Sequence, residues 1–436
     1  MSSKNKYILG LFIVVSYNFA CSQEQTWPLQ KCIDLALQNN LELQIKQLEI
    51  KRTQKVKNSI VNQMLPAVNL YGDQSYNFGS TIDPSTNGRV SSNIQYDNFY
   101  INARMSLIDF NSLATLKKEK NDIAKAKVEK EIIENEYKLQ LLESYYQALF
   151  TQELLKIQKE QFLNTEFNFD RVKKEVAIGS KPKSDLYDMQ LSYSQEEKRV
   201  LETEQLFYMQ KRQLFQLMNV VGVPIEDVLL VPYMGQKKSQ SSFDGFINLK
   251  IKFAEFRYQE NKDVLAIQRN SKLPILSGYY TFSTFYYRPL NSPSVGVDNF
   301  DTQLENNKNH QVGVQLSVPL FNGFRTQKKI ASSKIELEKS RLAVEQEKQK
   351  LDKQIEIETQ YHQNHEQLQA KLKEILNYAK ASFTTTQAKF VSGKVDAFVL
   401  SSVKNLLLTS SFDVLKNSLQ LEYVDLKINL LSNNQL

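Results

Sequence analysis

Two very long stretches of the chain contain neither glycine nor proline, and they restrict its fold more than any other feature. They cover residues 112–178 and 324–392 of a chain of 436 residues. Lysine, glutamate, glutamine and leucine are frequent in both stretches, and these residues favour helix. At 1.5 Å per residue, each stretch would form a helix roughly 100 Å long. Because the hydrocarbon core of a bilayer is only about 30 Å thick, such helices must project far from any membrane.

Both stretches end in a way that predicts a hairpin. Apolar residues recur along them at steps of three and four residues, as in an interrupted coiled-coil seam. Short turns that contain glycine follow at residues 177–185 and 391–397, and a new stretch without glycine or proline follows each turn. A glycine at a helix end before a new helix indicates antiparallel helices. We therefore expect helical hairpins at 112–221 and 324–436.

The two halves of the chain share one order of landmarks. The phrase SLIDFNSLATLKK at residues 106–118 returns as SVPLFNGFRTQKK at 317–329, with Ser, Phe-Asn, Thr and Lys-Lys at the same spacing. Such self-similarity predicts a two-fold internal repeat of helix, strand, strand, long helix and returning helix. The expected first repeat spans 23–221, the linker 222–247 and the second repeat 248–436.

Two segments of each repeat alternate with the period of two that is typical of strands. We expect strands at about 65–79 and 96–110 in the first repeat, and at about 274–287 and 309–321 in the second. A tilted strand needs about 9–11 residues to cross a bilayer, and apolar-out, polar-in alternation with aromatic ends is typical of a transmembrane barrel. The same alternation also fits a half-buried strand of a soluble sheet, so the alternation alone leaves both interpretations open.

The barrel interpretation assigns each side chain to lipid or to a water-filled lumen. The residues expected to face lipid are Ile101, Ala103, Met105, Val312, Val314, Leu316 and Val318. The residues expected to face the lumen are Asn102, Arg104, Gln311 and Gln315. Four strands leave two open edges, which cannot lie in lipid, whereas three chains give twelve strands, within the known range of barrels. The expected fold is thus mainly α with a β-barrel part: a trimer with a 12-stranded transmembrane β-barrel and a long α-helical periplasmic barrel.

The N-terminus has the pattern of an export signal. Lys4 and Lys6 precede an apolar run, and small residues follow it, so residues 1–22 are expected to form a signal peptide. Cys21 would be acylated if this is a lipoprotein signal. Simple cleavage nearby is the alternative, because Asn18 stands where an aliphatic residue is usual. With Cys32 as the only other cysteine, no intrachain disulfide is expected.

Charge and hydropathy argue against a nucleic-acid-binding protein and against a protein with membrane-spanning helices. The net charge is +7, but 55 basic and 48 acidic residues are mostly interspersed. That pattern is typical of solvated helical surfaces, and we expect no nucleic-acid partner. After the N-terminus no apolar stretch of about 18 residues occurs, so no membrane-spanning helix is expected.

Catalytic and metal-binding motifs are not evident. The three histidines are His310, His362 and His365. His362 and His365 could reach one metal ion from a helix, but the stretch HQNH lacks the glutamate of the metalloprotease motif. An ordinary helix surface is therefore the preferred interpretation. No phosphate-binding glycine loop and no paired nucleophile and base occur, so we expect no enzyme and no cofactor.

The chain resembles the TolC-like outer-membrane efflux proteins from about Trp27 to Leu431. The resemblance rests on TWPLQKCIDLALQNNLELQI, on LPAVNL and LPILSG before the strand pairs, on SVPLFNG before the second long helix, and on the two tips. It implies a homotrimeric channel in the outer membrane of a Gram-negative cell, extending into the periplasm. Such channels join a periplasmic adaptor and an inner-membrane transporter, in efflux or in type I secretion.

The same resemblance implies two functional sites. The tips would meet the adaptor through Ile178, Gly179, Ser180, Ser392, Gly393 and Lys394. In the best-known members, acidic residues beyond the second tip narrow the pore, but this chain has Val399 and Ser402 there. The first tip instead offers Asp185 and Asp188 beside Lys181 as a possible periplasmic gate, although both aspartates also suit the cap of a helix N-terminus.

Two other functions remain open from the sequence. An exported coiled-coil scaffold would explain the helices, and an exported binding protein could use the hairpins for docking. The scaffold does not explain the four alternating strands or the polar loops between them. Trimers that conduct ions in a planar bilayer would distinguish a channel from both alternatives.

Overall fold

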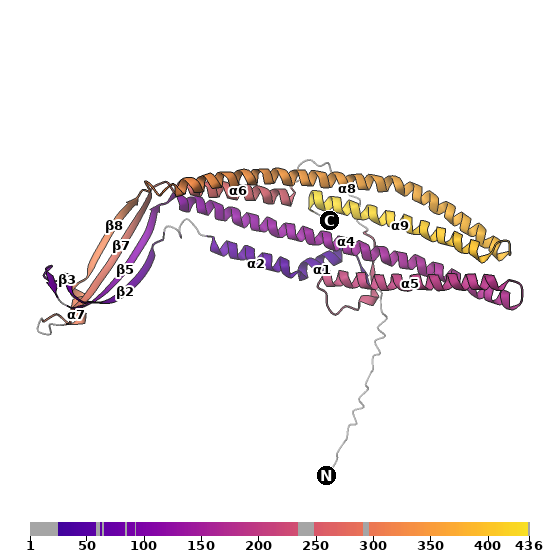
Figure 1. The fold of residues 1–436 in the computed structure, drawn as a ribbon, viewed down its shortest axis with the longest axis horizontal. Helices are drawn as coiled ribbons and strands as arrows, with labels where there is room; N and C mark the ends of the chain where they lie inside the picture. Colours follow the sequence, from indigo (N-terminus) through magenta and orange to yellow (C-terminus); the bar gives the residue numbers. More distant parts are fainter. Residues whose placement is uncertain are drawn as a thin grey trace, which may run out of the picture.

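The molecule is an elongated bundle of helices with a small sheet at one end (Figure 1). The structure is a computed structural model that describes residues 25–57, 62, 65–82, 85–91, 93–233, 248–290 and 296–434. The expected signal peptide and Cys21 therefore lie outside the described residues. The sheet and the hairpin tips lie at opposite ends of the long axis (Figure 1).

Two helices run most of the way from the sheet to the tips. Helix α4 spans Phe110–Ala177 with 68 residues, and α8 spans Arg325–Val391 with 67 residues. Asp109 caps α4, because its side chain accepts a hydrogen bond from the backbone N–H of Asn111. The second junction is longer: Gly323 and Phe324 both have positive φ, and α8 begins only after them. The Phe-Asn pair of the repeated phrase therefore starts a helix in the first copy but lies in a turn in the second.

Each long helix turns back at a glycine. Helix α5 spans Lys183–Leu217 and α9 spans Ala397–Asn433. Gly179 has φ +77° and Gly393 has φ +73°. The backbone N–H of the residue after each glycine bonds to a carbonyl five residues back, at 2.9 Å in both turns. Both tips thus have the C-cap that favours glycine because of its left-handed backbone.

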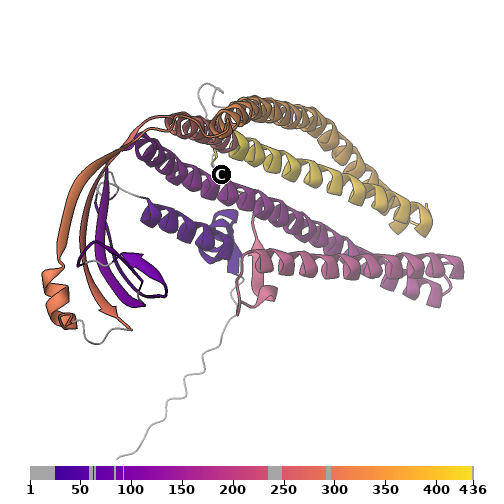
Figure 2. The same ribbon diagram turned by 60° about the vertical axis from the view of Figure 1, so that its left-hand side comes forward.

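The four long strands form one antiparallel sheet in the order β2-β5-β7-β8. Their bounds are β2 Ala67–Asn77, β5 Ile94–Ile108, β7 Ile275–Pro289 and β8 Asn309–Ser317. The sheet is curved (Figure 2), and β2 and β8 are its edges. Strand β8 ends before Val318, which was assigned to its lipid-facing side. Pro319 follows and lacks the N–H that would continue the ladder.

Further short elements complete the fold. They are β1 Gln25–Trp27, α1 Leu29–Asn39, α2 Leu41–Val56, β3 Ser80–Ile82, β4 Arg89–Ser91, η1 Ile225–Asp227, β6 Val228–Leu230 and α7 Phe300–Asn306. Of these, the helix that opens the first repeat, α2, was expected, whereas the short strands, η1 and α7 were not. Strand β6 pairs in parallel with β1, so part of the expected linker 222–247 is built into the fold. The reason is that Val228 and Leu230 are buried in the main apolar core, together with Trp27 and Cys32.

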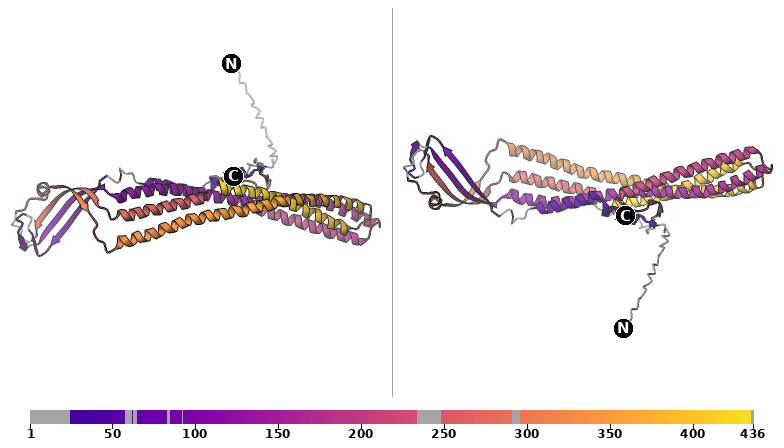
Figure 3. Two further views of the ribbon diagram at one scale, coloured as in Figure 1. Left: turned by 90° about the horizontal axis from the view of Figure 1, so that it is seen from above. Right: turned by 90° about the horizontal axis from the view of Figure 1, so that it is seen from below.

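The helices pack in pairs along the axis. Helix α4 packs with α5 and α8 with α9, while α6 Leu249–Asn270 packs against both α4 and α8. The two hairpins run side by side to the tips (Figure 3). Among the described residues one helix, α9, is long and apolar enough to cross a membrane. It packs on α8, α4 and α5, although only 22% of its most apolar window is buried in the single chain.

Candidate functional site

One face of the sheet brings together the polar side chains of the strands. Asn102 pairs with Thr281, and its side-chain amide donates to the Thr281 hydroxyl at 3.0 Å. Thr281 pairs in turn with Gln311 of the edge strand. Arg104 reaches across β7 and donates to Gln315 Oε1 at 2.5 Å. The four residues expected to line a lumen therefore share one face.

The opposite face is apolar and largely uncovered. Ile101 pairs with Leu70 on one side and with Phe282 on the other. At the edges, Leu70 is 74% exposed and Val312 is 82% exposed. Bare aliphatic side chains in water are unfavourable, by roughly 25 cal/mol per Å² of apolar surface. A sheet with one apolar and one polar face is suited to separate lipid from water. The assignment of each side chain to lipid or lumen stays a prediction.

The tips of the two hairpins are fixed to each other by a small core. Val172, Met189, Phe390, Ala397 and Leu400 are buried in it. Two cations of the first hairpin, Arg171 and Lys181, lie 4.7 and 4.0 Å from the centre of the Phe390 ring. Cation–π contacts of this kind stabilise by about 0.5–2 kcal/mol, so the second hairpin is attached to the first close to its end.

The acidic residues near the tips have different surroundings. Asp185, in the first turn of α5, lies 3.6 Å from Lys181 Nζ, and only 14% of its side chain is exposed. Asp188 is exposed one turn further along α5. Asp396 is the N-cap of α9 and accepts from the backbone N–H of Val399 at 2.9 Å. The structure thus brings Asp185 and Lys181 together and leaves Asp188 apart from them.

The tip turns themselves are open to solvent. Ile178 is 80% exposed, and nothing lies within 4 Å of a Cβ built on Gly179 or on Gly393. Ser180, Ser392 and Lys394 are also exposed. The six residues expected to contact an adaptor are therefore all at an accessible end of the molecule.

A buried ion pair, which sequence reasoning missed, connects the two hairpins above the tips. Lys404 of α9 lies 2.9 Å from Glu196 of α5 and also donates to Thr165 Oγ1 and to the Gln161 carbonyl of α4. Burial lowers the pKa of Lys404, and the negative charge of Glu196 opposes that shift. In the structure Lys404 lies between the buried residues Leu400 and Leu407 of α9.

The histidines of α8 bind separate partners on α9. His362 Nε2 lies 2.9 Å from Asp425 Oδ1, and His365 Nδ1 lies 2.6 Å from Asn417 Oδ1. His310 is on the sheet and bonds to the Tyr280 hydroxyl at 2.8 Å. In the described part of the chain, no three His, Cys, Asp or Glu side chains are placed to hold a metal ion. His362 and His365 thus serve helix pairing.

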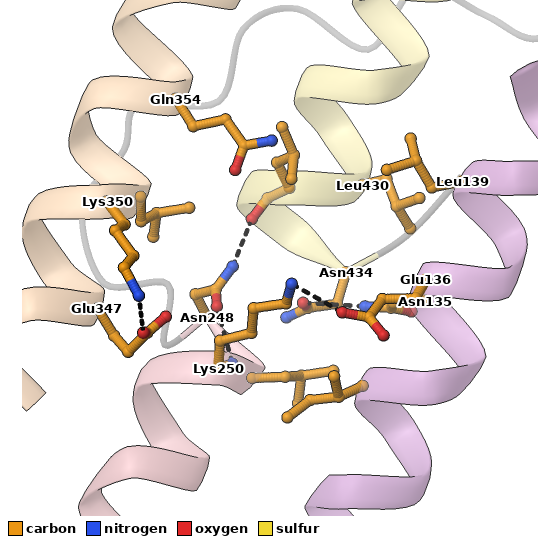
Figure 4. Close-up of a pocket in the computed structure, with 14 residues that line it drawn as sticks. Asn135, Glu136, Leu139, Asn248, Lys250, Glu347, Lys350, Gln354, Leu430 and Asn434 are labelled. Carbon is orange, nitrogen blue, oxygen red and sulfur yellow. Dashed lines mark hydrogen bonds and ion pairs between the residues drawn. The ribbon is translucent and has the colours of Figure 1, made fainter. Parts of the chain in front are cut away.

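A small cavity of about 180 Å³ lies where α4, α6, α8 and the end of α9 meet (Figure 4). Several of its polar side chains are paired with one another or with the backbone. Asn248 donates to the Leu431 carbonyl at 3.0 Å, and Lys250 lies 2.8 Å from Glu136. Lys350 pairs with Glu347 at 2.7 Å. The first two contacts join α6 to α4 and to the end of α9.

Cys32 is buried in the main apolar core and is unreactive there. Cys32 is fully buried, and burial raises the pKa of its thiol to about 12. A thiol with such a pKa remains protonated at neutral pH and is a poor nucleophile. Beside this core, burial also raises the pKa of the Glu422 carboxyl.

Comparisons with known proteins identify the family of the chain and relatives with the same fold. The profile of a family described as outer membrane efflux protein matches residues 32–220 and 248–422. The chain belongs to this family. The expected TolC-like relationship is thereby confirmed. A search of curated proteins found no match.

Solved channels of this family have the same fold. VceC from Vibrio cholerae has a TM-score of 0.77 at 14% identity, over 92% of this chain and 95% of VceC. CusC has a TM-score of 0.76 at 14% identity, over 92% and 91%. MtrE from Neisseria gonorrhoeae, solved in an open state, has a TM-score of 0.70 at 13% identity, over 93% and 89%. At these identities the likeness shows the fold alone.

Membership of the outer membrane efflux protein family decides between the functions left open by the sequence. Family members are outer-membrane channels of tripartite efflux systems that extend into the periplasm, and they are not enzymes. The prediction of an efflux channel is confirmed, and the scaffold and binding-protein alternatives are set aside. The family's tripartite systems imply an adaptor and an inner-membrane pump as partners.

Proposed function

We propose that three copies of this chain close into one duct, with a 12-stranded barrel in the outer membrane and a helical barrel in the periplasm. The observation that carries the proposal is the pair of open edges, β2 and β8, on a four-stranded antiparallel sheet. An unpaired edge costs several kcal/mol per backbone group in lipid. Pairing β8 of one copy with β2 of the next removes every edge.

Exposed apolar faces on the helices support the same assembly. In α2, Leu41, Ile45 and Leu48 lie on one face and are all exposed in the single chain. Helix α8 exposes a second set at mainly heptad steps, namely Ile335, Leu342, Tyr361, Leu368 and Ile375. Heptad spacing is typical of helices that pack on other helices. In the proposed trimer these faces lie between copies.

The tips are proposed to dock a periplasmic adaptor, which connects the duct to an inner-membrane transporter. Their distance from the sheet (Figure 1) and the exposure of Ile178 support this role. Closure of the resting duct is assigned to carboxylates at the start of α5, with Asp188 exposed and Asp185 held by Lys181. Cargo would then move through a water-filled lumen while the pump supplies the energy.

A disulfide across the open edges tests the trimer. Within one chain β2 and β8 are separated by β5 and β7, so their backbones are about 14 Å apart. That separation exceeds the Cα reach of a disulfide, about 7 Å. In a Cys32→Ser background, Asn69→Cys combined with Gln311→Cys or Gln315→Cys can therefore crosslink only between chains.

The expected result is a covalent ring at three times the monomer mass for at least one of the two combinations. Each single-cysteine variant provides the matched control and should remain monomeric on a denaturing gel. Oxidised products confined to dimers, or an open ladder beyond three chains, would contradict the closed trimer.

A further inference from the structure

The polar face of the sheet carries aromatic rings in the half that lies farther from the long helices. Tyr71 pairs with Tyr100, and their rings stack with centroids 4.8 Å apart and an interplanar angle of 20°. Tyr96 and Phe285 stack in the same way, at 5.4 Å and 27°. Tyr96 and Tyr100 are four residues apart on β5, or about 13 Å. We call Tyr71, Tyr100, Tyr96 and Phe285 the aromatic track.

The register fixes the face on which the track lies. Tyr96 and Tyr100 occupy the same parity of β5 as Asn102, which bonds to Thr281 on the polar face. The apolar residues Ile101 and Ala103 have the opposite parity. If the sheet closes as proposed, the track therefore faces the lumen and not lipid. The inference below rests on that proposed function.

Sheet stability alone does not account for this placement. Cross-strand aromatic pairs stabilise a sheet on either face. On the lipid side, burial in hydrocarbon would add to that stabilisation, whereas rings in a water-filled lumen remain partly wet. The Tyr71 side chain is 47% exposed, so the ring is available to a molecule in the lumen.

The charge beside the aromatic track is negative and comes from Asp73. Asp73 pairs with Asn98, which pairs with Phe285. On this face the Asp73 row therefore contains Phe285 and lies between the rows of Tyr100 and Tyr96. Asn98 donates to Asp73 Oδ1 at 3.5 Å. In the described rows from Tyr71 to Asn77, Asp73 is the one charged residue on this face. Three copies would place three carboxylates around the lumen, and a focused negative potential concentrates cations.

We propose that the track and Asp73 form a binding site for aromatic organic cations in the outer half of the lumen. Aromatic faces attract a cation through the ring quadrupole and stack on planar rings in offset arrangements. Asp73 supplies the opposite charge. The rings of the three copies would give several weak sites around the lumen. Weak sites favour passage of the cation, because it can move from one ring to the next without being held in a deep energy minimum.

Block of single-channel current tests the site on the full-length protein in a planar bilayer. The probes are tetraphenylphosphonium as an aromatic cation, tetrabutylammonium as an aliphatic cation and naphthalenesulfonate as an aromatic anion, each added on the side of the barrel loops. We expect tetraphenylphosphonium to reduce the potassium current at about tenfold lower concentration than tetrabutylammonium. Naphthalenesulfonate should block least.

The variants separate the ring contribution from the charge. Tyr71→Leu with Tyr100→Leu keeps an apolar side chain at both positions but removes the rings, and it should remove most of the advantage of tetraphenylphosphonium over tetrabutylammonium. Asp73→Asn should weaken block by both cations to the same extent. Tyr76→Leu is the matched control, since Tyr76 lies on the same strand with the opposite parity and should change neither.

The outcomes distinguish this inference from the proposed function. A protein that forms no conducting trimers would refute the duct itself. Trimers that conduct but are blocked equally by both cations, in the native protein and in the Tyr71→Leu, Tyr100→Leu variant alike, would overturn the aromatic site and leave the duct intact.

Discussion

Lys404 Nζ lies 2.9 Å from Glu196 Oε2, and both side chains are almost entirely buried between the two hairpins. The Thr165 hydroxyl donates to the same carboxylate oxygen at 2.7 Å. Three helices, α4, α5 and α9, therefore meet at one charged site in an otherwise apolar seam. Such a pair adds little net stability over apolar residues, but it is costly to break in half, because the remaining charge stays buried.

Glu196→Gln should therefore destabilise the protein strongly. The variant leaves the Lys404 ammonium buried without a counter-charge, which costs about 3–5 kcal/mol. Lys404→Met combined with Glu196→Leu should recover most of that loss. Urea unfolding in detergent, followed by circular dichroism, measures both. Glu202→Gln on the same helix is the control, because its partner Lys198 is exposed and exposed pairs contribute about 0–1 kcal/mol. A Glu196→Gln variant as stable as Glu202→Gln would contradict this account.

The same site predicts a pH dependence of stability. Burial lowers the pKa of Lys404 from its ordinary value of 10.5. Between the lowered native pKa and 10.5, the unfolded chain binds more protons than the folded chain, so the free energy of unfolding rises with pH in that window. Lys404→Met should lose this rise. Urea midpoints measured from neutral pH to pH 10 check it, and identical pH profiles for the two proteins would refute the prediction.

Gly179 and Gly393 should resist substitution for conformational reasons alone. Both have positive φ, and a Cβ would meet no neighbour at either position. Alanine is therefore expected to cost roughly 1–2 kcal/mol through the left-handed backbone, without steric clash. Gly296→Ala is the control, because Gly296 is also open but has no positive φ. Thermal unfolding of the three variants compares them.

Function at the tips should be more sensitive than stability. Gly179→Glu or Gly393→Glu places a charge at the proposed adaptor contact, and efflux of a fluorescent substrate from intact cells should fall to background. Trimers on a native gel should persist. Efflux at the normal rate with both glutamates present would show that the adaptor binds elsewhere.

The sequence predicted the periodic parts of the fold and missed the irregular ones. The long helices could be predicted because a stretch without glycine and proline has few alternatives to helix. The strand faces followed from alternation, and Asn102 and Gln311 do share a face. Strand β6 could not be predicted, because three residues carry no period and its stability comes from pairing with distant β1.

The candidate site shows the same division. The tip glycines were visible as breaks in helical composition. The Lys181–Asp185 pair was anticipated as neighbours in sequence, but the position of Lys181 over the Phe390 ring joins residues from different hairpins. Lys404 and Glu196 looked like two of many solvated charges. Only the packing of α9 against α4 and α5 shows that they are buried.

Substitutions on neighbouring residues of β8 should differ in cost if one face meets lipid. Val314 pairs with Gly278 and Gln315 with Ser277, so their side chains lie on opposite faces. Val314→Arg at a midplane position should cost roughly 2–4 kcal/mol, whereas Gln315→Arg should be tolerated in a polar lumen. Folding into lipid vesicles, titrated with urea, measures both. Equal costs for the two arginines would contradict the assigned faces.

The two carboxylates at the start of α5 should have separable roles. Asp185 is paired with Lys181 at 3.6 Å and lies in the first turn of α5, where the helix dipole favours a negative charge by about 0.3–1 kcal/mol. Asp185→Asn should therefore lower the melting temperature and change ion selectivity little.

Asp188 is exposed, and three copies around a narrow pore would attract cations. Asp188→Asn should reduce the preference for potassium over chloride and weaken block by hexamminecobalt, with the melting temperature unchanged. Glu202→Gln, further along α5, controls for the loss of one negative charge per chain. Unchanged selectivity in Asp188→Asn would place the constriction at another level of the duct, because a ring of carboxylates cannot be neutralised without changing the field through which ions pass.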